Sequence, residues 1–96
     1  MLVNFDAELK GLNGEVKKAQ EGNVTLKSIV ANALLGNYED ERNLQAEQKV
    51  KRYKLAHKVT EGGEIEVDAE DTVLMRKLVN KAYGTLIVGQ VFDILK

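Results

Sequence analysis

The chain has 96 residues, no cysteine, and 14 lysine and arginine residues against 15 aspartate and glutamate residues, for a net charge of −1. This length predicts one domain, residues 1–96, and the lack of cysteine excludes disulfides and thiolate chemistry and is typical of a reducing compartment. The balanced charge argues against nucleic-acid binding, which requires a surplus of positive charge. We expect no signal peptide and no membrane span, because no basic leader and no apolar run of roughly 18 residues is present.

The N-terminal segment predicts a β-hairpin. Asn13-Gly14 is a strong two-residue turn signal, and it would join the arms Leu2–Leu9 and Glu15–Ala19. The second arm is polar, so we expect a short and exposed hairpin. We expect Val3 and Phe5 to be the best buried residues of the first arm, and we assign Phe5 to the core.

A helix with one buried face follows. Its apolar residues have the spacing i, i+3, i+4, i+7, i+8, and they are Leu26, Ile29, Val30, Ala33 and Leu34. Asn23 or Thr25 can cap its N-terminus, and Gly36 can end it in the left-handed conformation. A polar loop is predicted over residues 37–42.

The second helix is predicted from Gln45 or Ala46 to about Thr60, and Gly62-Gly63 ends it. Its buried side is predicted to hold Ala46, Val50, Tyr53, Ala56 and His57, extended by Leu55 and Val59. Its opposite side carries Glu47, Lys51, Lys54 and Lys58.

A short strand and a third helix come next. Residues 64–68 alternate polar and apolar, which predicts a half-buried strand that joins the N-terminal hairpin. Asp68 is a good N-cap, with acidic residues in the first turn where they meet the positive end of the helix dipole. Met75, Leu78, Val79 and Ala82 give the third helix its buried face.

Residues 83–96 have the highest apolar density in the chain. Thr85 is predicted to cap a helix that is buried nearly all round, either in the core of the chain or against a second copy. A homodimer through this C-terminal helix is therefore one expectation.

The predicted fold class is α+β, with a short hairpin and a third strand near residues 64–67 packed on about four helices. The predicted core comprises Phe5, Leu26, Ile29, Val30, Ala33, Leu34, Val50, Tyr53, Leu55, Val59, Leu78, Val79, Ala82, Ile87, Val88, Val91, Phe92 and Leu95.

No catalytic, cofactor or metal site is predicted. The glycines of residues 84–91 have the spacing of a phosphate-binding loop, but Gln90 and Val91 stand where that loop needs lysine and serine or threonine. We interpret Gly84 as a helix end and Gly89 as a point of close packing. His57 is the only histidine, and we expect it to pack at the edge of the core.

Charged residues offer the candidate partner-binding positions. The second helix is locally basic, with Lys51, Lys54 and Lys58 in one row, and no aromatic residue interleaves with that row to stack bases. Glu64 and Glu66 would line the solvent face of the following strand. This contrast predicts a dipolar surface suited to a charged protein partner or to a second copy.

Three segments resemble a group of small proteins encoded by tailed bacteriophages and prophages. They are Thr25–Leu35, Lys49–Ala56 and Tyr83–Val91. The group has no assigned activity, so the resemblance implies a phage origin and the bacterial host cytoplasm, and it carries over no functional residues.

Three functional hypotheses follow. The first is a non-enzymatic protein that binds and occludes a host or anti-phage-defence protein. The alternative is a structural or assembly component of the phage that forms homo-oligomers. The third, an enzyme centred on His57, is the weakest, because no nucleophile accompanies the imidazole.

Overall fold

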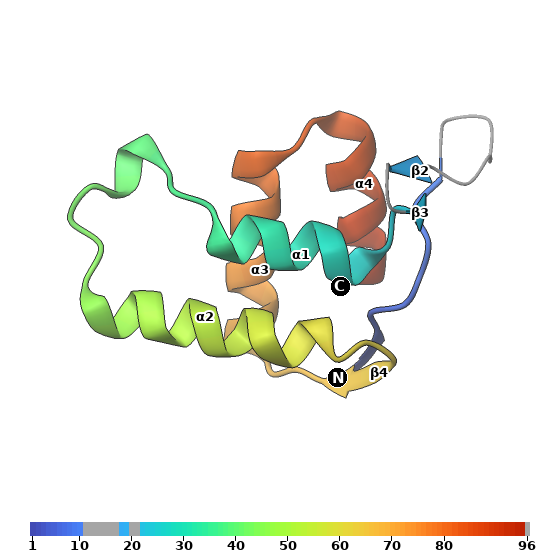
Figure 1. The fold of residues 1–96 in the computed structure, drawn as a ribbon, viewed down its shortest axis with the longest axis horizontal. Helices are drawn as coiled ribbons and strands as arrows, with labels where there is room; N and C mark the ends of the chain where they lie inside the picture. Colours follow the sequence, from blue (N-terminus) through green and yellow to red (C-terminus); the bar gives the residue numbers. More distant parts are fainter. Residues whose placement is uncertain (11–17, 20–21, 96) are drawn as a thin grey trace.

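The computed structural model describes residues 1–10, 18–19 and 22–95 (Figure 1). These residues form four α-helices, one short 3-10 helix and two small antiparallel sheets, which confirms the predicted α+β class. In chain order the elements are β1 (Leu2–Asn4), β2 (Lys18–Ala19), β3 (Gly22–Asn23), α1 (Leu26–Leu35), η1 (Glu39–Glu41), α2 (Ala46–Thr60), β4 (Glu64–Glu66), α3 (Ala69–Ala82) and α4 (Thr85–Ile94).

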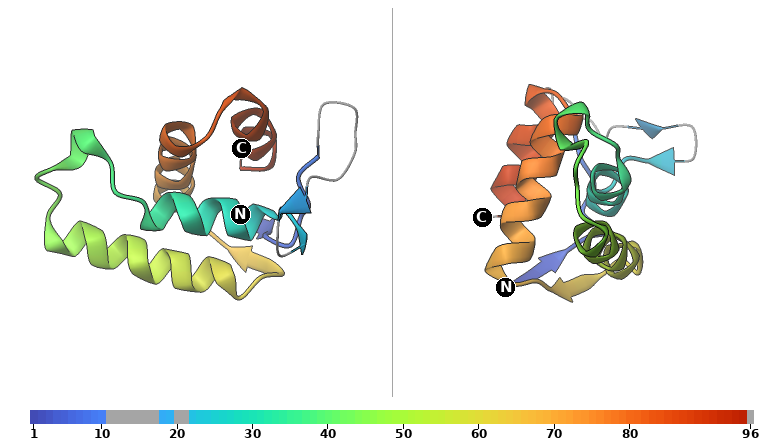
Figure 2. Two further views of the ribbon diagram at one scale, coloured as in Figure 1. Left: turned by 45° about the horizontal axis from the view of Figure 1, so that its top comes forward. Right: turned by 90° about the vertical axis from the view of Figure 1, so that its left-hand side faces the viewer.

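Helix α1 lies at the centre of the molecule, because it packs against both α2 and α3. α1 and α2 run side by side, α3 crosses behind them, and α4 packs against α3 (Figures 1 and 2). Strands β1 and β4 lie at the end of α2 where the N-terminus also lies (Figure 1). None of the four helices, over the residues described, has the length and apolar character needed to cross a bilayer.

The predicted joining of the strand near residue 65 to the N-terminal segment is confirmed. β1 pairs antiparallel with β4, and Val3 stands opposite Ile65. Both of these side chains are buried, while Leu2, Glu64 and Glu66 are exposed, as the alternation of the sequence requires. The sheet therefore has one face on the core and one in solvent.

The predicted pairing of the two N-terminal arms is not the one seen. Lys18–Ala19 pair with Gly22–Asn23, and Leu2–Asn4 pair with β4. The predicted turn at Asn13-Gly14 lies outside the described residues.

Thr25 caps α1, which confirms one of the two predicted caps. Its hydroxyl accepts from the Ser28 amide, and the Ser28 hydroxyl accepts from the Thr25 amide in return. Gly36 follows the helix with φ −71°, so the predicted left-handed end is wrong. Glycine is instead needed for space, since a Cβ on Gly36 would lie 2.9 Å from the hydroxyl of Tyr38, which donates to the Ala33 carbonyl at 2.6 Å.

Helix α2 has the predicted bounds, and only part of its predicted buried side is buried, namely Leu55, Ala56 and Val59. The buried residues are Arg52, Leu55, Ala56 and Val59, again at helical spacing. The core assignment of Val50 and Tyr53 is wrong, because these side chains are 49% and 60% exposed, and His57 is exposed as well. The helix carries apolar residues on two stripes, and the stripe that is buried is the one with Leu55, Ala56 and Val59, next to Arg52.

Two glycines follow α2 and an aspartate caps α3, both as predicted. Gly62 and Gly63 have φ of +74° and +70°, which favour glycine. The Asp68 carboxylate accepts from the Asp71 amide at 2.8 Å and caps α3. Within α3, Met75, Leu78 and Val79 are buried, whereas Ala82, assigned to the core, is exposed.

Helix α4 is less buried than predicted. Val91 is fully buried and so is Leu95, which follows the helix, whereas Ile87, Val88 and Phe92 are half-buried. The helix begins at Thr85 after Gly84, and no side chain caps it, so the predicted cap is wrong. The close-packing role of Gly89 is also wrong, because an added Cβ would meet nothing within 4 Å among the described residues.

Gln90 fastens α4 to the N-terminal segment. Its side-chain amide donates to the Lys10 carbonyl at 2.6 Å and accepts from the Lys10 amide at 2.8 Å. This pair of bonds joins positions 80 residues apart.

The remaining core assignments are confirmed, and the core also includes Val3, Leu9, Ala31, Ala56, Ile65, Val67 and Met75.

Candidate protein-interaction surface

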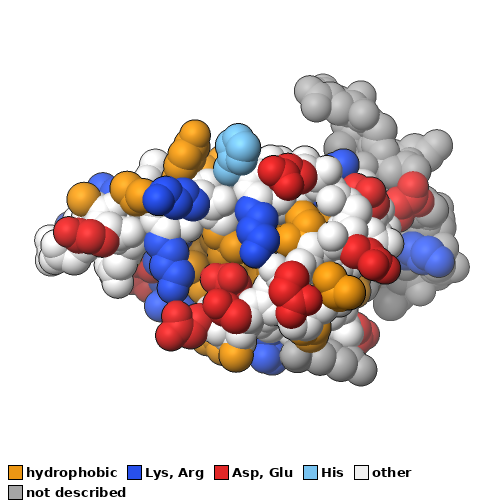
Figure 3. Space-filling view, turned by 90° about the horizontal axis from the view of Figure 1, so that it is seen from below, with side chains coloured by type: hydrophobic (Ala, Val, Ile, Leu, Met, Phe, Trp, Pro, Cys, Tyr) orange, Lys and Arg blue, Asp and Glu red, His pale blue; other side chains and the backbone are white. Residues whose placement is uncertain are grey.

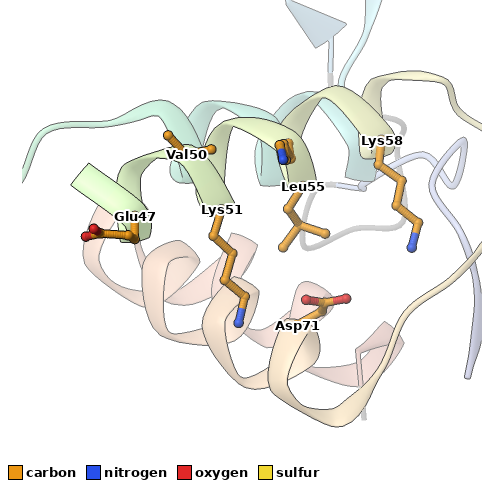
Figure 4. A pocket seen from close by; sticks show the side chains of 7 residues that line it. Glu47, Val50, Lys51, Leu55, Lys58 and Asp71 are labelled. Atoms are coloured by element: carbon orange, nitrogen blue, oxygen red, sulfur yellow. The ribbon is translucent and has the colours of Figure 1, made fainter. Parts of the chain in front are cut away.

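The predicted basic row lines a groove between α2 and the start of α3. We call this the α2–α3 groove, and it has a volume of about 380 Å³. Its lining residues are Glu47, Val50, Lys51, Lys54, Leu55, Lys58 and Asp71. Figure 4 shows Lys51 and Lys58 reaching from α2 toward α3 on either side of Leu55, with Asp71 on α3 below. Helical spacing of four and three residues places the lysines on one side of α2.

Two of the three lysines have partners within the chain. The Lys51 ammonium lies 3.3 Å from the Glu70 carboxylate, and the Lys58 ammonium donates to the Glu66 carbonyl at 2.7 Å. Over residues 1–10, 18–19 and 22–95, Lys54 has no ion pair. Lys54 is therefore the cation of the groove that is available to another molecule.

The predicted acidic positions are exposed beside this row. Glu66 forms an ion pair with the N-terminal ammonium at 2.7 Å, and Glu64 points into solvent on the same strand. The Lys51–Glu70 pair joins the basic helix to the acidic segment, so opposite charges lie across one groove and do not form distant poles. Figure 3 shows this face, with basic and acidic side chains around apolar ones.

An apolar stripe runs along α2 next to the groove. We call it the outer stripe of α2, and it consists of Ala46, Val50, Tyr53 and His57, all exposed, with Val50 also lining the groove. His57 is exposed, so the prediction that it packs at the core edge is wrong, and its ring lies 6.3 Å from that of Tyr53. Figure 3 shows the imidazole, in pale blue, on this face with an apolar side chain close by. Exposed apolar side chains that share one helix face are typical of protein contact surfaces.

A buried ion pair on the other side of α2 was not foreseen. The Arg52 guanidinium donates two hydrogen bonds of 2.7 Å to the Glu41 carboxylate, and only 8% and 11% of these side chains are exposed. The Lys81 ammonium lies 2.9 Å from Asp40 and 3.4 Å from Glu41. This cluster fastens η1 to α2 and α3. The sequence did contain a signal for the burial of Arg52. This residue stands three, four and seven residues before Leu55, Ala56 and Val59, so it shares their buried helix face.

The cluster shifts the acidity of its members. Hydrogen bonds from Arg52 lower the pKa of Glu41 from 4.5 to about 2, and the same pair raises the pKa of Arg52. The hydrogen bond to Asp40 raises the pKa of Lys81, and burial raises the pKa of Tyr38. Glu41, Arg52 and Lys81 therefore stay ionised at neutral pH, and the cluster acts as a fixed structural clamp.

Within the described part of the chain, no three histidine or acidic side chains are grouped closely enough to hold a metal ion. Comparison of the sequence with protein-family models and with curated proteins, and of the structure with solved structures, gives no match.

Proposed function

We propose that this chain is a non-enzymatic binding protein that uses the α2–α3 groove to dock on a partner protein and occlude it. The observation that carries the proposal is the combination found in the groove, an apolar floor at Leu55 and half-exposed Val50 beside the unpaired Lys54. Protein interfaces are typically built in this way, with an apolar centre and a charged rim. The rim then selects the partner by charge, and the floor supplies apolar burial.

The partner we propose is a host or anti-phage-defence protein in the bacterial cytoplasm. The three segments that resemble small phage and prophage proteins support this setting. The surface also fits occlusion, because the groove is open along α2 and needs no moving part to engage a partner.

The test is capture of a protein from bacterial lysate by the full-length chain and by two variants. Lys51→Glu reverses a charge on the rim of the groove, and Lys49→Glu is the matched control, since Lys49 is an exposed residue of the same helix that does not line the groove. We expect the wild type and Lys49→Glu to recover the same partner, and Lys51→Glu to lose it. Recovery of the bait alone, or equal loss with both variants, would count against the proposal.

A phage assembly component is the alternative function, and it requires that the exposed outer stripe of α2 form a contact that propagates beyond two copies. It predicts rings or larger homo-oligomers whose mass rises with concentration. Light scattering separates the two, since a monomer or a closed dimer contradicts the assembly role.

A further inference from the structure

The outer stripe of α2 has the spacing of a helix–helix contact. Its members, at positions 46, 50, 53 and 57, are separated by four, three and four residues, which is the repeat that keeps apolar side chains on one seam between two helices. Val50 and Tyr53 stand at its centre with 49% and 60% of their surface exposed. In the right-hand view of Figure 2, described elements lie above, to the left of and below α2, and none is drawn directly to its right.

The charges beside the stripe are self-complementary. Glu47 and Lys54 are seven residues apart, so they lie on the same side of the stripe and about 10.5 Å from each other along the helix axis. Both are exposed, and neither has an ion pair among the residues that the structure describes. An antiparallel second helix with the same sequence would bring its lysine to this glutamate and its glutamate to this lysine.

We infer that a second copy of this chain docks on the outer stripe, with the two α2 helices antiparallel about a twofold axis that passes between Val50 and Tyr53. Each Val50 then packs against Tyr53 of the second copy, and each Ala46 packs against its His57. Two Glu47–Lys54 ion pairs close one side of the contact. The arrangement is isologous, so it stops at two copies and does not propagate.

The same stripe would accept a different amphipathic helix, but the charges favour a second copy. An unrelated partner requires no particular order of charge along α2, whereas an antiparallel pair requires an acid and a base two turns apart on one side, as Glu47 and Lys54 are. The contact involves one helix from each chain, so its area falls below the roughly 1,200 Å² of standard interfaces. We therefore expect a dissociation constant in the micromolar range.

The test is sedimentation velocity of the full chain across micromolar concentrations, with two charge-reversed variants. Glu47→Lys alone and Lys54→Glu alone each turn two attractive pairs into two repulsive ones, and each should weaken dimerisation on the order of tenfold. The double variant should recover wild-type dimerisation. An equimolar mixture of the two single variants should form a heterodimer more strongly than either variant forms a homodimer, because both of its pairs are then attractive.

Both positions are exposed, so circular dichroism should show folded variants. Tyr53→Asp, in the centre of the stripe, should give a monomer, and Asp93→Lys on the exposed side of α4 should dimerise as the wild type does. A wild type that stays monomeric into the millimolar range overturns the inference. So does a mixture of the two charge variants that does not associate, or a dimer that Asp93→Lys disrupts, which would place the contact on the C-terminal helix.

Discussion

Replacing Glu41 by glutamine should destabilise the fold severely, although the side chain keeps its shape. The substitution leaves the Arg52 guanidinium charged, 8% exposed and without the carboxylate that accepts its two hydrogen bonds of 2.7 Å. The pKa of Glu41 falls from 4.5 to about 2, and at about 1.4 kcal/mol per pKa unit this difference corresponds to about 3 kcal/mol of stability at pH 7. Breaking a buried ion pair on one side typically costs roughly 3–5 kcal/mol, so the two magnitudes agree.

The sign of the pH dependence follows from the same shift. Because the pKa of Glu41 is lower in the folded chain, its contribution is present above pH 4.5 and is lost as the pH falls toward 2. The assay is urea unfolding followed by far-ultraviolet circular dichroism between pH 7 and pH 3. Glu41→Gln should lower the free energy of unfolding at pH 7 by about 3 kcal/mol, and the variant should lack this part of the wild-type pH dependence.

A double variant separates the ion pair from simple packing. Arg52→Met combined with Glu41→Gln removes both charges, and it should recover much of the stability that the single variant loses. A loss of less than about 1 kcal/mol in Glu41→Gln, the range of exposed ion pairs, would refute the reasoning. It would mean that water solvates the Arg52 guanidinium in place of the carboxylate.

Three further substitutions test the backbone and the C-terminal helix by urea unfolding. Gly89→Ala should stabilise the fold by up to about 1 kcal/mol, because alanine favours a helix interior and its Cβ meets open space; a loss would instead support the close-packing role. Gly62→Ala should cost more than the roughly 1–2 kcal/mol of a left-handed alanine, because its Cβ would also lie 2.5 Å from Asp6 Oδ1, and a neutral result would mean that this turn rearranges freely. Val91→Asp should unfold the chain because Val91 is 0% exposed, and a folded variant would show that α4 is dispensable to the core.

The features that the sequence predicted correctly depend on residues that are close together in the chain. Thr25 and Asp68 cap helices through bonds to amides three residues away, and Gly62 supplies a positive φ at the end of α2. The strand at residues 64–66 was predicted by its alternation alone. Its pairing with the N-terminus followed, because a single short strand needs a partner.

The buried face of α2 was mispredicted because that choice is made by other elements. Val50 and Tyr53 form a stripe as regular as that of Leu55 and Val59. In the folded chain Leu55, Ala56 and Val59 pack into the core, and the Glu41 carboxylate of η1 pairs with the Arg52 guanidinium that is buried beside them, whereas Val50 and Tyr53 stay exposed.

The burial of α4 and the position of the groove also depend on how separate elements pack, so neighbouring residues in the sequence could not predict them. The sequence shows that α4 is apolar, but its burial depends on how much of its surface α3 and the N-terminal segment cover. The lysine row was predicted from spacing, whereas its position across from Asp71 depends on the packing of α2 and α3 against α1.

We propose that α2 presents the interaction surfaces of this chain, and hydrogen–deuterium exchange of the chain, free and in complex with the protein captured from lysate, measures this directly. We expect added protection in α2 and in the first turn of α3, where the groove lies, with α4 unchanged. Protection confined to α4, with α2 unaffected, would contradict it.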